Sequence, residues 1–157
     1  MTPEAIAAVR RSYEGLAAKP QVAPRFYEEL FALEPSLRHL FPSDVTLLQE
    51  HFEASIALAV RSLDDMSALH ESLRELGAKH VHWGARPEDY VTAREALIAA
   101  IRALSPGWDV KLEHAWRSAV TAVMVPMLEG AAVHTAMAAV RLAAETPDVF
   151  PGSPAKL

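Results

Sequence analysis

Apolar side chains recur every three or four positions along most of this chain, and this spacing predicts helices rather than strands. The periodic segments are separated by proline-containing stretches, and the sequence holds 11 prolines. Valines do not alternate with polar residues, and no Asn-Gly or Asp-Gly pair that would close a β-hairpin occurs. The pattern therefore predicts an all-α fold of seven to eight helices of uneven length.

Prolines and capping residues set the expected limits of these helices. We expect Pro126 to kink the last long helix, because proline cannot donate the backbone hydrogen bond that a helix interior requires. Helical composition then resumes over 131–145 as a C-terminal extension of a domain spanning 1–145, and 146–157 is predicted to be a flexible tail. The expected helices cover about 2–18, 24–33, 46–62, 66–80, 87–104 and 112–127, with a short helical piece around 37–41.

Length and composition exclude several classes of protein. A chain of 157 residues fits one domain. The absence of cysteine excludes a disulfide framework, a thiolate nucleophile and an iron–sulfur centre. A net charge of −5 argues against a nucleic-acid partner, the most apolar run is too short to span a membrane, and no signal peptide is evident. We expect a cytoplasmic protein.

His80 is the unusual member of one apolar stripe, because it continues the series Leu69, Leu73 and Leu76 at the next helical step. One interpretation is a buried histidine that is hydrogen-bonded to a nearby carbonyl. The other is a metal ligand, since neutral imidazole is the commonest metal-binding side chain. No zinc-binding His-Glu-x-x-His pair, nucleophile elbow or glycine-rich phosphate loop offers competing chemistry.

Three further segments occur in an order typical of one family. Phe26 to Phe31 is followed by Pro35 and then by Leu40-Phe41-Pro42. The second segment is Leu76-Gly77-x-x-His80-x-x-Trp83-Gly84-x-x-Pro87-Glu88-x-Tyr90, and the third is Ala115-Trp116-x-x-Ala119. Together they resemble bacterial globins, both single-domain haemoglobins and the haem domain of flavohaemoglobins. The resemblance runs from about residue 2 to residue 128 and implies a globin fold around a haem b (iron protoporphyrin IX) pocket.

The resemblance also implies roles for individual residues. His80 is then the axial iron ligand and Tyr90 lies behind it. Phe41 stacks on the haem, and Tyr27 offers its hydroxyl to a bound gas. Leu48 faces the iron with Phe52 one turn later, which agrees with helix geometry because four residues turn through about 400°.

Some positions leave alternatives open. His51 lies about 300° from Leu48 and suits a haem propionate or solvent better than the iron. Bacterial globins often carry glutamine at the position aligned with Leu48, so a one-residue shift would bring Gln49 inward instead. The glutamate that polarises the proximal histidine in flavohaemoglobins aligns with Ala131, although Glu129 is near.

The function implied is binding of O2, NO or CO at a His-ligated iron. Conversion of NO to nitrate would need an external reductase, because the chain ends before a flavin domain could follow. Two alternatives are a gas or redox sensor that signals through residues 131–145 and a non-haem helical interaction domain. We expect the iron to be five-coordinate or closed by a sixth ligand such as Tyr27 or a distal histidine, and the protein to be a monomer or a homodimer.

Overall fold

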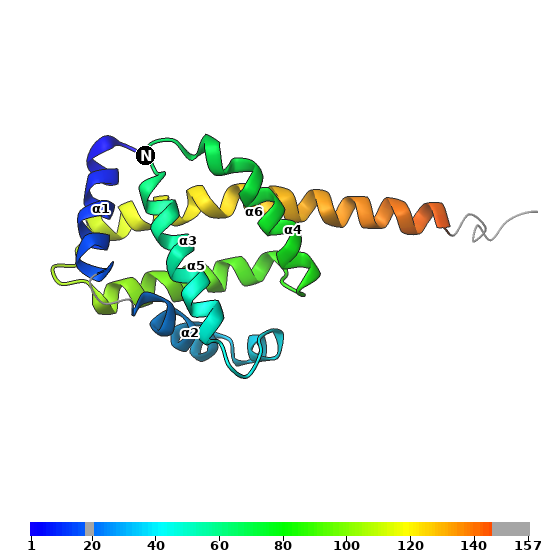
Figure 1. The fold of residues 1–157 in the computed structure, drawn as a ribbon, viewed down its shortest axis with the longest axis horizontal. Helices are drawn as coiled ribbons and strands as arrows, with labels where there is room; N and C mark the ends of the chain where they lie inside the picture. Colours follow the sequence, from blue (N-terminus) through cyan, green and yellow to red (C-terminus); the bar gives the residue numbers. More distant parts are fainter. Residues whose placement is uncertain (18–20, 146–157) are drawn as a thin grey trace, which may run out of the picture.

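A computed structural model describes residues 1–17 and 21–145 of the chain, and in these residues it is helical without strands. The all-α prediction is therefore confirmed. Six α-helices and two short 3-10 helices (η) are arranged as Figure 1 shows. They are α1 (Pro3–Ala17), α2 (Val22–Leu33), η1 (Pro35–Leu40), α3 (Thr46–Arg61), η2 (Met66–Leu69), α4 (His70–His82), α5 (Pro87–Leu104) and α6 (Val110–Glu145).

The expected helix limits agree with these bounds to within about two residues, except that the expected helix 66–80 is divided into η2 and α4 and that the C-terminal end differs. There the prediction of a helix that is interrupted and then resumes at residue 131 is wrong, because α6 is one helix that contains Pro126. Pro126 is buried, and so are Met127 and Gly130 beyond it. The tertiary contact that buries this turn offsets the hydrogen bond that proline cannot make. The predicted tail, 146–157, lies outside the described residues.

The core consists of two connected groups of buried side chains. The first joins α1, α3, α5 and α6, where Ile98 and Ile101 of α5 are almost completely buried. The second joins α2, η1 and α5 and is rich in aromatic rings. Phe52 of α3 and Leu97 of α5 contact both groups, so α5 connects the two halves of the molecule.

Two glycines let α4 and α6 approach each other closely. A Cβ atom built on Gly77 of α4 would overlap the backbone carbonyl of Met127, and one on Gly130 of α6 would overlap the carbonyl of Arg74. Neither carbonyl can move without moving its helix. The absence of side chains at these two positions therefore fixes where α4, which carries His80, lies on α6.

Helix α6 has two different halves. Its first half supplies core residues such as Trp116 and Val120, whereas residues 132–145 are all exposed and project beyond the other helices in Figure 1. By length and composition alone, α6 is the one described helix that could cross a membrane. A core helix meets the same criterion, and the packing of the first half of α6 explains much of its apolar character.

Candidate functional site

His80 lies in the last turn of α4 as a half-buried side chain. Its Nδ1 atom is 2.8 Å from the backbone carbonyl oxygen of Leu76. A carbonyl can only accept a hydrogen bond, so Nδ1 carries the proton and Nε2 keeps a free lone pair. Burial lowers the pKa of His80 below its ordinary value of 6.5, although the bond to Leu76 partly opposes this. The chain thus holds a neutral imidazole whose Nε2 can bind a metal.

Lowering the pH should destabilise the cofactor-free chain through His80. Because the folded pKa lies below 6.5, the unfolded state binds more protons as the pH falls past that value. The free energy of unfolding should then decrease by at most about 1.4 kcal/mol per pH unit from this group. Urea denaturation at several pH values between about 7.5 and 5.5 measures the slope. His80→Gln should show a shallower decline, and equal slopes would contradict the buried neutral state.

The turn that follows α4 depends on a glycine. Gly84 has a φ of 94°, a left-handed conformation that glycine adopts without strain. The backbone N–H of Gly84 donates to Val81, and that of Ala85 donates to the carbonyl of His80. Such a pattern ends a helix and satisfies its last carbonyls. The helix therefore ends directly after the histidine and leads the chain into α5.

Tyr90 of α5 lies beside His80, with ring centroids 6.1 Å apart, and Trp83 lies at 5.3 Å. Tyr90 is buried, and its hydroxyl has no hydrogen-bond partner in the described part of the chain. Burial also raises the pKa of Tyr90, so the hydroxyl stays protonated. Buried hydroxyls are nearly always satisfied. This unsatisfied group therefore indicates that something other than the described protein completes the surroundings of His80.

The apolar stripe of α4 is only partly covered by protein. Leu69, Leu73 and Leu76 are each half-buried, and the one fully buried residue of α4 is Gly77, which faces α6. Helix α3 packs on α1 and α2, whereas α4 packs on α6 and η2, so α3 and α4 have no comparable interface with each other. Both helices therefore keep apolar surface that the described chain does not fully cover.

The second side of the site is a cluster of aromatic rings. The ring of Tyr27 lies 5.6 Å from Phe41 and 6.1 Å from Phe52, measured between centroids. Phe52 stacks on Phe26 at 4.4 Å. Leu48 packs against the same cluster. Gln49, the next residue, is half-buried like Leu48.

Polar contacts from neighbouring elements hold the helices of this cluster. The carboxylate of Glu53 on α3 accepts a 2.7 Å hydrogen bond from the backbone N–H of Ala23 at the start of α2. Arg38 donates to the carbonyls of Phe41, Pro42 and Ser43 at 2.8 to 3.2 Å. The first contact ties α2, with Tyr27, to α3. The second fixes the corner that carries Phe41.

Tyr27 is buried, yet its hydroxyl forms no hydrogen bond with the described residues. Burial raises its pKa, so the hydroxyl remains a proton donor at neutral pH. Among the described residues, the hydroxyl of Tyr27 is therefore not bonded to a backbone carbonyl, as it would be in an ordinary core tyrosine. The hydroxyl oxygen of Tyr27 is not among the fully buried atoms that lack a partner, so it is open to water or to a small polar ligand.

The other histidines lie on the surface. His51 is on the exposed side of α3, and His82 is exposed two residues after His80. His39, His70, His114 and His134 are also exposed. The Nε2 atom of His70 lies 3.3 Å from the carboxylate of Glu129, which therefore pairs with His70 and not with His80.

The residues at this site fit a haem. The described residues contain no group of three or more His, Asp or Glu side chains that could hold a bare metal ion. A single imidazole is sufficient when a porphyrin supplies the remaining in-plane ligands. Apolar surface on α3 and α4 suits the flat, largely apolar faces of such a group.

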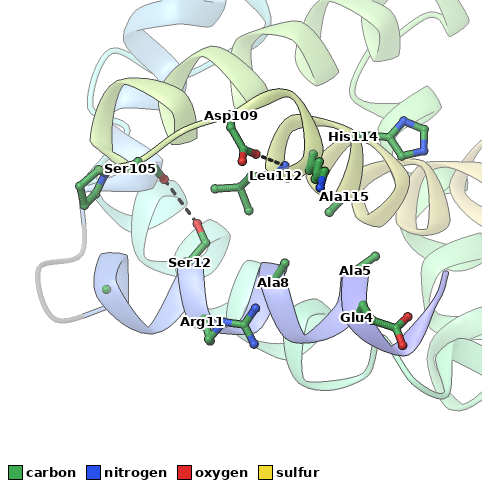
Figure 2. Close-up of a pocket in the computed structure, with 14 residues that line it drawn as sticks. Glu4, Ala5, Ala8, Arg11, Ser12, Ser105, Asp109, Leu112, His114 and Ala115 are labelled. Atoms are coloured by element: carbon green, nitrogen blue, oxygen red, sulfur yellow. Dashed lines mark hydrogen bonds between the residues drawn. The ribbon is translucent and has the colours of Figure 1, made fainter.

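A separate hollow of about 590 Å³ lies between α1 and the start of α6 (Figure 2). Its floor includes Ala8 and Leu112, and Ser12 and Ser105 are hydrogen-bonded across it at 3.4 Å. None of the predicted site residues lines it. The hollow is therefore separate from the residues around His80.

Comparison with known proteins assigns the family. The globin family model matches residues 24–127, which is more than half of the chain, so this protein belongs to the globin family. A crystallised protein from Pseudomonas aeruginosa PAO1, described as structurally highly homologous to a human hemoglobin, matches with a TM-score of 0.72. It is 27% identical, and the match covers 80% of this chain and 97% of that protein.

Two curated relatives are similar at modest identity. Neuroglobin-2 of Oncorhynchus mykiss is 29% identical over 138 residues, which cover 78% of this chain and 87% of that protein. A flavohemoprotein of Vibrio cholerae is 29% identical over 112 residues, which cover 66% of this chain but only 27% of the flavohemoprotein. The chain thus spans about a quarter of that relative. The predicted globin fold is confirmed, and membership of this family implies haem binding.

Proposed function

We propose that this globin binds one haem b through Nε2 of His80 and holds O2, or another diatomic gas, reversibly. The observation that carries the proposal is the half-buried, neutral His80, whose Nδ1 is engaged by Leu76 while Nε2 is free. Its family and the apolar surface of α3 support the same cofactor.

The bound haem would supply a ferrous iron with one position open to a gas. His80 holds the group from α4, and its hydrogen bond to Leu76 fixes the plane of the imidazole. Phe41, Leu48 and Phe52 would exclude water from the aromatic side of the site. The hydroxyl of Tyr27 donates a hydrogen bond to the gas.

Two further residues act at the edges of the site in this proposal. Tyr90 packs beside His80 and restricts rotation of its ring. His51 lies on the exposed side of α3, where it can pair with a haem propionate. A non-haem domain would need Phe52 to fill the haem space, and the ring of Phe52 stacks on Phe26 of α2.

The hydrogen-bond partner of His80 favours reversible binding over peroxidase-like chemistry. A carboxylate on Nδ1 would make the imidazole more basic and more electron-donating. Here the partner is a neutral carbonyl, Glu129 is paired with His70, and the residue aligned with the expected glutamate is Ala131. The proximal side therefore favours gas retention.

Oxidation of NO to nitrate is a second candidate function, with electrons from a separate reductase. Similarity to the flavohemoprotein favours this reaction. Tyr27 would donate its hydrogen bond to the O2 that reacts with NO. Rapid mixing of the O2-loaded protein with NO, with nitrate measured afterwards, tests the reaction. Sustained turnover with an added reductase would support this role, and slow single turnover would leave reversible gas binding as the function.

Tyr27→Phe should release O2 faster by about 5- to 100-fold, because a hydrogen bond of about 1–3 kcal/mol is lost. Stopped-flow displacement of O2 by CO measures this rate. Tyr13→Phe is the matched control, since Tyr13 is a partly buried tyrosine of α1 that packs in the other core group. An unchanged rate in Tyr27→Phe would contradict the assigned donor.

A further inference from the structure

The exposed end of α6, residues 132–145, lacks the features of a helix that is stable on its own in water. Its length is about 21 Å, and isolated helices this short are marginal even when rich in alanine. Every residue in it is exposed, and Figure 1 shows it projecting beyond the globin helices. Few of its residues are charged. A helix with apolar residues on most sides is normally covered by a partner.

Three of the four large exposed apolar residues of this segment have the spacing of a coiled-coil seam, and the fourth, Leu142, lies outside it. Val133, Met137, Val140 and Ala144 are separated by four, three and four positions, which is the a/d spacing of a heptad repeat. Val133, Met137 and Val140 are 50%, 52% and 63% exposed. They therefore form a continuous stripe on one side of the helix.

The charges and the register of the segment indicate that the partner is a second copy of the chain. When two copies are antiparallel, Met137 lies opposite Val140 and Val133 lies opposite Ala144. The same register places residue 132 opposite residue 145, so it covers the exposed segment from end to end. A single antiparallel register therefore pairs the apolar residues with one another and also covers the whole exposed segment.

No like charges meet in this register. Arg141 lies opposite Ala136 and Glu145 lies opposite Ala132. His134 lies opposite Ala143. These alanines also allow the two helices to approach closely, because they carry only a methyl group. Self-association therefore requires no compensating charge on a different protein.

We propose that two copies of this globin associate through antiparallel pairing of residues 132–145. The interface is small, on the order of 1,000 Å² in total, which is near the lower limit for a specific complex. The dimer is accordingly weak and depends on protein concentration. It forms whether or not the His80 site holds a cofactor, so its test does not depend on the proposed function.

Sedimentation velocity of the full chain over a range of concentrations measures the association. Val140→Glu places a charge in the apolar stripe twice per dimer, and the dissociation constant should rise at least about tenfold. Ala139→Glu is the matched control, because it adds the same charge one position away, outside the seam. It should leave the dissociation constant within about twofold of the original value.

Engineered disulfides test the orientation, because the chain has no cysteine of its own. Mixed Val133→Cys and Ala144→Cys chains should cross-link to each other on oxidation. Each variant alone should not, since its two cysteines would be displaced by about 16 Å along the axis, beyond disulfide reach.

Four results would overturn the proposal. If the chain is a monomer at every concentration, residues 132–145 do not pair. If Val140→Glu and Ala139→Glu weaken the dimer equally, the apolar stripe is not the contact. Self-linking of Val133→Cys would show a parallel pair instead. Co-flotation of a monomeric chain with phosphatidylcholine vesicles would assign this surface to lipid. Circular dichroism of each variant checks that its helix content is unchanged.

Discussion

Replacing His80 with glycine is expected to abolish stable haem retention. The described chain offers one half-buried imidazole beside the uncovered apolar surface of α4, and glycine at this position supplies no ligand atom. The haem should be lost on gel filtration, and the absorbance ratio of the haem Soret band to the protein band should fall to near zero. Added imidazole, which can enter the space left by the side chain, should restore retention.

The matched control for this prediction is His82→Gly. His82 is two residues away on the same helix but exposed, so its replacement should leave haem retention unchanged. Both variants introduce glycine near the end of α4, which separates a loss of ligation from a general weakening of the helix. Full retention of haem by His80→Gly would place the iron ligand elsewhere.

Gly77→Ala should destabilise the fold by about 3 kcal/mol or more, at the upper end for an overpacked core. The added methyl group would overlap the carbonyl of Met127, so α4 and α6 must move apart. Gly77 is three residues before His80, and the displacement should therefore weaken haem binding as well. Thermal denaturation and haem titration measure the two effects.

Gly15→Ala is the control for Gly77→Ala, because it should raise the stability of the fold instead of lowering it. No atom lies within 4 Å of the Cβ position at Gly15, which is exposed on α1. Alanine should stabilise this helix by about 0.5–1 kcal/mol through backbone entropy and helix propensity. If both substitutions had the same sign, close packing at Gly77 would not be the cause.

Much of the fold follows from local sequence signals. The spacing of Leu48, Phe52 and Ile56 predicts the inward side of α3, and proline or glycine marks the limits of α4 and α5. These features depend on residues close together in the chain, and the structure confirms them. His80 is also recognisable from the sequence, because a polar ring is unusual at the helical position that follows Leu69, Leu73 and Leu76.

Contacts between distant segments could not be predicted in the same way. The continuity of α6 through Pro126 goes with burial of that turn, whereas the local composition predicts an interruption before residue 131. The pairing of Glu129 with His70 joins residues far apart in the chain, and nothing in the spacing of either indicates it.

Two glycines carry a further signal that the apolar spacing does not use. Gly77 and Gly130 lie inside helices, where glycine is unfavourable by about 1 kcal/mol relative to alanine. Glycine in such a place often marks close backbone approach. Reading the two together would have predicted that α4 and α6 cross closely near the candidate ligand.

Titration of the cofactor-free chain with haem, followed by optical absorption, tests most directly whether His80 makes this chain a haem protein. The Soret band should sharpen and stop growing at one haem per chain in the original protein and in His82→Gly. In His80→Gly it should remain that of free haem until imidazole is added. A spectrum of free haem at every ratio in the original protein would contradict haem ligation by His80.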